Sequence, residues 1–130
     1  MCKHAYHLAG MDQAFAALVS DLETRVRLDR TMVVFLTEFG RTPKINPRGG
    51  RDHWGAAGSI FFAGNGVRGG QVIGATDNHG AAPLTRPISP ADVAATMYAV
   101  LGINHRGWVE DLIQRPRLIL DHGRPVAELF

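Results

Sequence analysis

The sequence predicts an α/β fold, and three observations support this prediction. Apolar residues recur three and four positions apart from Met11 to Leu28, which is typical of one face of a helix. The run Met32–Leu36 is continuously apolar and contains β-branched residues, which favours a strand buried on both faces. A segment rich in glycine and proline, residues 37–58, then interrupts the pattern. Because a helix that leads into a buried strand is half of an α/β unit, we expect a central sheet with flanking helices and a C-terminal β-hairpin.

The first predicted helix, residues 11–28, has one apolar and one charged face. Charged residues such as Asp21 and Arg25 fall mostly opposite the apolar positions. The apolar positions are Met11, Phe15, Leu18, Val19, Leu22 and Val26. We place the strand that follows in a parallel sheet with helices outside, since such strands are apolar throughout.

Beyond the long loop, two short strands are expected to form a β-hairpin. They are Ser59–Ala63 and Gln71–Gly74, joined through a glycine-rich turn at residues 64–66. Residues 75–88 are polar and contain glycine and proline, so they are predicted to form a loop.

A second helix is expected to begin after Ser89 and to run to about Leu101. Ser89 is a good N-cap, proline suits the first helical position, and Asp92 completes a pattern that resembles a capping box. Gly102 ends the helix. The C-terminal hairpin is expected to pair residues 117–120 with residues 125–129.

The composition is that of an ordinary folded protein. Of the 130 residues, 45% are hydrophobic and 20% are charged, which argues against disorder. The formal net charge is only +2, and no run of Lys or Arg marks a nucleic-acid-binding surface. Cys2 is the only cysteine, so no intrachain disulfide is expected. The apolar runs are too short to span a membrane, and His4 and His7 stand where a signal peptide needs apolar residues.

The strongest candidates for chemistry lie in the loop of residues 37–58, because ligands of open α/β sheets bind at the carboxyl ends of strands. Glu38 follows the buried strand directly, and its carboxylate suits Ca²⁺ or Zn²⁺. Asp52 and His53 stand side by side in a flexible loop, so both can face the same cation. The alternatives are an ion pair between Glu38 and Arg41, and a turn capped by Asp52 with His53 packed on Trp54.

Three arginines accompany these acids. Guanidinium groups bind phosphate or sulfate oxygens in pairs, so Arg41 and Arg51 are candidates for holding an anion or for pairing with the acids. For Arg48 we favour an ion pair with an acid.

Other motifs have simpler interpretations. Residues 64–69 match G-x-G-x-x-G, but a strand follows where a dinucleotide site needs a helix, so a turn is favoured. Asp77 and His79 are interpreted as turn residues. No G-x-S-x-G motif occurs, and neither Thr37 nor Ser59 has a base at a recognisable spacing, so no nucleophile is assigned to this chain.

Several segments, in the same order, resemble the DUF1501 family, and the likeness covers about residues 10–129. The segments are 12–14, 31–46, 50–54, 69–77, 86–96 and 101–103. The resemblance places the chain with the alkaline phosphatase and sulfatase superfamily. It implies a large α/β domain with a central sheet, of which this chain would form a partial alkaline-phosphatase-like fold. It also implies hydrolysis of phosphate or sulfate esters with a divalent metal ion.

The resemblance also implies roles for individual residues. In the superfamily, a strand ending in Thr-Ser-Asp-His-Gly delivers an aspartate to the metal, and residues 37–40 are similar, with Glu38 in the aspartate's place. Phe39 stands where an adjacent ligand often lies, and His53 matches a later histidine. The implied ligands of Zn²⁺, Ca²⁺ or Mn²⁺ are Glu38, Asp52 and His53. Arg41 and Arg51 would stabilise a small anionic ester substrate.

Members of this family are several times longer and usually begin with an export signal, which implies an exported or periplasmic full-length protein. We therefore expect residues 1–130 to be the C-terminal third of a sulfatase-like domain. The nucleophile and the other ligands would lie in the missing N-terminal part, so the chain alone is expected to have little or no activity. Two alternatives stay open: a non-catalytic member that binds or assembles through the same fold, which Phe39 favours, and a self-contained binding module.

Overall fold

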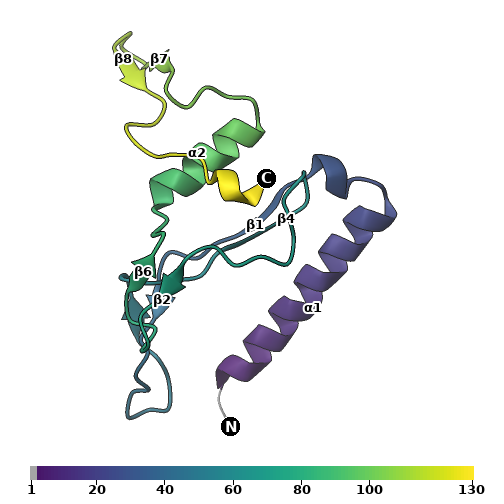
Figure 1. Cartoon of the computed structure of the whole chain (residues 1–130), viewed down its shortest axis with the longest axis vertical. Helices are drawn as coiled ribbons and strands as arrows, with labels where there is room; N and C mark the ends of the chain where they lie inside the picture. The colour runs from purple at the N-terminus through teal and green to yellow at the C-terminus, as the bar shows by residue number, and fades with distance from the viewer. Residues whose placement is uncertain (1–2) are drawn as a thin grey trace. The chain divides into compact units, whose positions relative to one another are not determined.

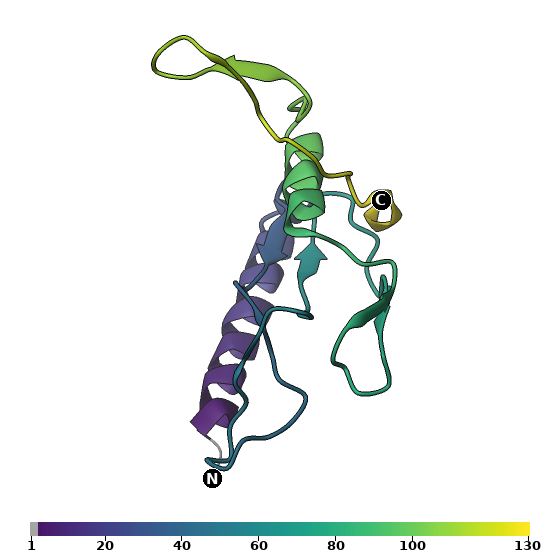
Figure 2. The same cartoon turned by 90° about the vertical axis from the view of Figure 1, so that its left-hand side faces the viewer.

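The computed structural model describes residues 3–130, which divide into two compact units. The first unit ends at Thr85, and the second spans Arg86–Phe130 (Figures 1 and 2). The described residues form α-helices and short β-strands, so the mixed α/β class is confirmed. The prediction of a central sheet is wrong for the described residues, because their strands form four separate two-stranded antiparallel sheets.

Helix α1 spans Lys3–Thr24, so it begins and ends earlier than the predicted helix. The backbone N–H of Arg27 donates to the carbonyl of Leu22, and that of Val26 donates to Glu23. Val26 itself has a φ of 53°. These features form a left-handed helix ending of the kind that usually carries glycine. Val26 is therefore outside the helix and 75% exposed, and its predicted place on the inward face is wrong.

Strand β1 (Val33–Phe35) pairs with β4 (Phe61–Ala63) in antiparallel register, with Phe35 opposite Phe61. The prediction that this strand lies in a parallel sheet is wrong. The chain returns through the long loop, and β4 runs antiparallel to β1. The Phe35 and Phe61 rings stack with centroids 4.6 Å apart, and Phe15 of α1 meets Phe61 edge-on at 4.6 Å. These aromatic contacts pack α1 against the strand pair. The residues of β1 are half-buried rather than buried on both faces.

The glycine-rich segment after β4 is a turn, as predicted. The Asn65 N–H donates to the Leu28 carbonyl over 2.7 Å, beside the short 3-10 helix η1 (Leu28–Arg30). Gly64 has a φ of 80°, and a Cβ there would collide with the carbonyls of Leu28 and Thr31. The turn therefore packs against the backbone, and residues 71–74 form no strand. The predicted hairpin between β4 and these residues is wrong, because β4 pairs with β1.

Part of the predicted loop of residues 75–88 forms a further strand pair. Strand β5 (Ala75–Thr76) pairs with β6 (Pro83–Thr85). Asp77 closes the turn between them, since its carboxylate accepts hydrogen bonds from the backbone of His79 and Ala81. The hydrogen bond from Ala81 is the main reason that the pKa of Asp77 is lowered. The turn role predicted for Asp77 and His79 is confirmed.

In the second unit, helix α2 spans Pro90–Val100 and confirms the predicted capping. The Ser89 hydroxyl accepts from the Asp92 N–H, and the Asp92 carboxylate accepts from the Ser89 N–H. Gly102 follows the helix with a φ of 72°, as expected for a glycine at a helix end.

The C-terminal hairpin exists, but its strands differ from the predicted ones. Strand β7 (Trp108–Glu110) pairs with β8 (Pro116–Leu118) because a turn at residues 111–114 folds the chain back. The last segment instead ends in a 3-10 helix, η2 (Ala127–Leu129). Its Val126 N–H donates to the hydroxyl of the fully buried Thr96 over 2.9 Å, which fastens the tail to α2.

Among the described residues with assigned burial, the buried side chains all belong to the second unit: Val93, Ala95, Thr96, Val126 and Leu129. Neither α-helix in residues 3–130 has the length and apolar character needed to cross a membrane.

Candidate functional site

The candidate residues lie on a β-hairpin of the first unit. Strand β2 (Gly40–Arg41) pairs with β3 (His53–Trp54), with Arg41 opposite His53. The Thr42 N–H donates to the Asp52 carbonyl over 3.0 Å, which extends the pairing by one residue. Gly40 has no room for a side chain, because a Cβ would collide with the Ala57 carbonyl. The hairpin thus brings two segments of the sequence together, residues 38–41 and 51–54.

Three side chains gather on one face of this hairpin. The rings of Phe39 and His53 stack with centroids 3.9 Å apart. The guanidinium carbon of Arg41 lies 5.4 Å from the Phe39 centroid, within cation–π range. Arg41 and His53 are both exposed, so an imidazole and a guanidinium lie beside each other at the surface.

Asp52 has a different environment from its neighbour His53. Its carboxylate accepts a hydrogen bond from the Asn46 side-chain amide over 2.8 Å. Asn46 also accepts, through Oδ1, from the backbone N–H groups of Arg48 and Gly50. Consecutive residues along a strand point to opposite faces, so Asp52 and His53 diverge. Asp52 therefore braces the loop through Asn46, and Asn46 caps the turn, whereas the alternative interpretation placed the cap on Asp52 itself.

The arginines near the hairpin divide into two kinds. Arg51 donates through Nη1 to the carbonyls of Thr42, at 2.7 Å, and Pro43, so it closes the loop. Arg41 makes a single long hydrogen bond, 3.4 Å, to the Arg51 carbonyl, which leaves most of its donors available. Among the described residues, neither of these arginines nor Arg48 forms an ion pair with an acid. The ion pair favoured for Arg48 is therefore absent from this part of the chain.

The structure does not bring Glu38, Asp52 and His53 together. Glu38 is exposed and makes no ion pair with a described residue. Within the described residues, no three His, Cys, Asp or Glu side chains are grouped closely enough to hold a metal ion. The three-ligand site stays a prediction.

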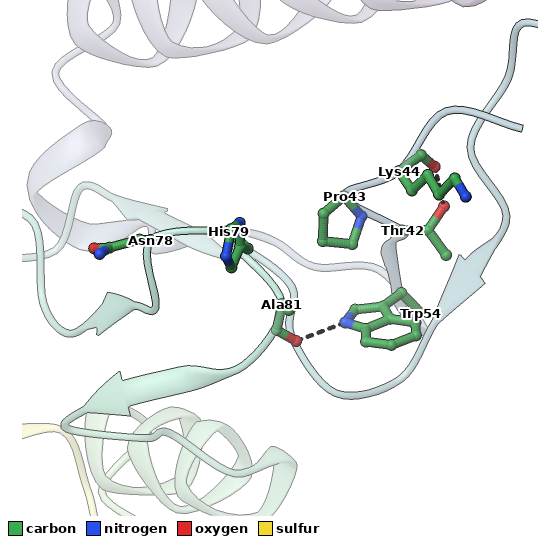
Figure 3. Close-up of a pocket in the computed structure, with 7 residues that line it drawn as sticks. All are labelled: Thr42, Pro43, Lys44, Trp54, Asn78, His79 and Ala81. Atoms are coloured by element: carbon green, nitrogen blue, oxygen red, sulfur yellow. Dashed lines mark hydrogen bonds between the residues drawn. The ribbon is translucent and has the colours of Figure 1, made fainter.

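A cavity of about 620 Å³ opens beside the hairpin (Figure 3). The Trp54 indole N–H donates to the Ala81 carbonyl over 2.7 Å, which joins the β2–β3 hairpin to the turn between β5 and β6. Figure 3 shows Trp54 and Pro43 on one side and His79 on the other. The residues that line the cavity are Thr42, Pro43, Lys44, Trp54, Asn78, His79 and Ala81.

Comparison with known proteins identifies the family. The profile described as "Protein of unknown function (DUF1501)" matches residues 2–130. The chain belongs to the DUF1501 family. No curated protein and no solved structure matched the chain in these comparisons.

The cavity of this DUF1501 chain is lined by residues that the sequence analysis did not assign to a site. Lys44 and Trp54 flank the predicted site in the sequence, but nothing local indicated that they share a cavity with His79. The Trp54–Ala81 hydrogen bond creates this proximity across 27 positions. The one available signal was the tryptophan next to His53, since a buried indole N–H generally needs a partner.

Proposed function

We propose that this DUF1501 chain is the C-terminal part of a hydrolase domain of the alkaline phosphatase and sulfatase superfamily, acting with a divalent metal ion on phosphate or sulfate esters. The register of the β2–β3 hairpin carries the proposal. It sets Arg41 opposite His53 at the surface, although the two residues are 12 positions apart in the sequence. A guanidinium beside an imidazole suits an oxyanion, since both groups donate hydrogen bonds to anionic oxygens.

The proposed metal dependence rests on the family resemblance, because the chain's own ligands do not fit one cation in this structure. Asp52 is bound to Asn46, and His53 is stacked on Phe39. We therefore assign no step of the reaction to a metal ion held by this chain alone. In the proposal, Glu38 and His53 are exposed metal ligands. They act together with further ligands supplied from outside these 130 residues.

Within the proposal, Arg41 is the anion-binding residue and Arg51 positions the loop. Arg41 has donors to spare, and the Phe39 ring supports its guanidinium from one side. A planar guanidinium binds two oxygens of a phosphate or sulfate group at once. Arg51 uses Nη1 on the carbonyls of Thr42 and Pro43, so its loss should act mainly through the shape of the loop.

The test uses the protein expressed from its complete reading frame and the 130-residue chain in parallel. Hydrolysis of an aryl phosphate and an aryl sulfate is measured with added Zn²⁺, Ca²⁺ or Mn²⁺ and after chelation. We expect turnover only from the complete protein, with loss of at least about a hundredfold on Arg41→Gln, by analogy with other groups that stabilise charge in a transition state. Robust turnover by the 130-residue chain would contradict its incompleteness, and chelation without effect would contradict the metal dependence.

A second candidate function is binding or assembly without catalysis. The observation that favours it is the Phe39–His53 stack, which covers one face of the imidazole with an apolar ring. Calorimetric titration of the complete protein with Zn²⁺ separates the two functions. Equal binding by the parent and by Glu38→Ala and His53→Ala variants, or no binding at all, would favour the non-catalytic function.

A further inference from the structure

A second cavity, of about 350 Å³, lies in the second unit at the base of the β7–β8 hairpin. One wall is formed by His105 and Arg106, which lead into β7. The other wall comes from the segment between Leu118 and Arg124, which follows β8. The Ile119 N–H donates to the Gly107 carbonyl over 3.0 Å and joins the two walls. The cavity is therefore built by one continuous hairpin and its flanking segments.

The wall formed by the segment between Leu118 and Arg124 is fixed to helix α2. The Arg124 N–H donates to the Asp92 carboxylate over 2.8 Å. Gly123 has a φ of 120°, and a Cβ at this position would collide with the Ala91 carbonyl. The backbone of Gly123 and Arg124 is thus held against the first turn of α2 without any ligand. A ligand would lose little free energy in ordering this wall.

The lining of the cavity is rich in cationic and imidazole groups. Arg106, Arg124, His105 and His122 line it, against a single acid, Asp121. The four ion pairs found among the described residues involve neither Arg106 nor Arg124. Two unneutralised guanidinium groups at one small cavity favour an anion and oppose a cation.

One nitrogen in this lining lacks a hydrogen-bond partner. The Nε2 atom of His105 is buried and bonded to no described group. Buried polar atoms are nearly always hydrogen-bonded, because a buried donor without an acceptor is costly. This nitrogen is closed off from the cavity as well as from solvent, so it takes no direct part in binding.

The chemistry of the lining selects the class of ligand. A metal ion is disfavoured, since no described group of three His, Cys, Asp or Glu side chains could hold one. Phosphate and sulfate groups match guanidinium donors in pairs. The volume is at the lower end of the range for small-molecule sites, so it also has room for the organic part of a small ester.

We propose that this cavity binds the phosphate or sulfate group of a small organic anion. Arg106 and Arg124 hold its oxygens, beside the imidazoles of His105 and His122, which also line the cavity. The proposal is independent of the hydrolase function, because every residue involved belongs to the second unit.

The test is an NMR titration of the 130-residue chain with inorganic phosphate and, separately, inorganic sulfate at constant ionic strength. We expect saturable shifts of the His105 and His122 imidazole signals. Arg106→Gln and Arg124→Gln should each weaken the apparent affinity by about tenfold, since a hydrogen bond to a charged group is typically this strong.

The matched control is the double variant Arg115→Gln with Arg117→Gln. These arginines belong to the same hairpin segment, but they pair with Asp111 outside the cavity. The control should keep the parent's affinity. The proposal is overturned by an equal loss of affinity in the control, by shifts that do not saturate, or by the same shifts with chloride. Because the unsubstituted chain reports directly through His105, a variant that fails to fold does not decide the outcome.

Discussion

The Phe39 ring lies flat against the His53 imidazole, with ring centroids 3.9 Å apart and an interplanar angle of 26°. Arg41, the cross-strand neighbour of His53, contacts the same aromatic ring. Phe39 is therefore the platform that orients the two polar groups of the hairpin. This contact gives a physical reason for phenylalanine at position 39, where the family resemblance led us to consider a metal ligand.

Replacing Phe39 by alanine should loosen this arrangement. The change removes the ring stack and the cation–π contact, each worth about 1 kcal/mol. We expect the unfolding free energy from urea titration to fall by about 1–2 kcal/mol. The His53 side chain should become mobile, which its NMR signals would report. Phe39→Tyr keeps the ring and serves as the control. Unchanged His53 signals in the alanine variant would show that the stack is not what orients the imidazole.

Val26 offers a gain of stability at the end of α1. A β-branched residue at a φ of 53° costs about 1–2 kcal/mol that glycine does not pay. The side chain is 75% exposed, so little packing is lost by removing it. Val26→Gly should therefore raise the unfolding free energy by about 1 kcal/mol. Val26→Ala, which keeps the unfavourable backbone geometry, should recover much less, and equal gains from both variants would refute the explanation.

Acid should destabilise the second unit through Asp92 and Glu128. The Ser89 backbone N–H is the main cause of the lowered pKa of Asp92, and the Arg86 side chain is the main cause for Glu128. A carboxyl with a lower pKa in the folded chain adds stability above its unfolded pKa, which is 3.8 for Asp and 4.5 for Glu. This stability is lost as the pH falls through and below these values.

The measurement is the unfolding free energy at pH values from 6 down to 2. Asp92→Asn should lower stability at pH 6 and flatten the decline toward acid, because the charged form no longer contributes. Arg86→Gln should have the same effect through Glu128, which lies 2.6 Å from the Arg86 Nε atom. A decline as steep in both variants as in the parent would place the acid sensitivity elsewhere.

The predictions from sequence succeeded where structure is set by neighbours along the chain. Helix α2 was placed correctly because Ser89, Pro90 and Asp92 form a local capping pattern. The turn at residues 64–66 was also local. The partner of a strand is not set by its neighbours along the chain, since β1 pairs with a segment that begins 26 positions after its own last residue. An apolar run such as Val33–Phe35 carries no record of which strand lies beside it.

The candidate site shows the same limit. Proximity in sequence made Asp52 and His53 look like a shared pair of ligands, but strand pairing turns their side chains to opposite faces. The family resemblance found the hairpin segments, and it could not show that Asn46 binds Asp52. Nothing in the sequence marks His105, because only the fold shows that its Nε2 atom is buried.

The hydroxyl of Thr96 should prove to be the main attachment of the C-terminal segment to α2. It donates to the Asp92 carbonyl over 2.7 Å and accepts from the Val126 N–H, in a side chain with no exposed surface. Thr96→Val keeps the shape but leaves the buried Val126 N–H without a partner, at a cost of about 1–3 kcal/mol. We expect this loss in urea unfolding together with faster hydrogen exchange of the Val126 amide.

Thr96→Ser is the matched control, because it keeps the hydroxyl and removes one methyl group, for which about 1 kcal/mol is typical. Its Val126 amide should stay protected. Since Arg124 lies two residues before Val126, the valine variant should also weaken phosphate binding at the cavity of the second unit, whereas the serine variant should not. If Thr96→Val left Val126 as protected as in the parent, the tail would have to be held by other contacts, with the Arg124–Asp92 hydrogen bond as the next to test.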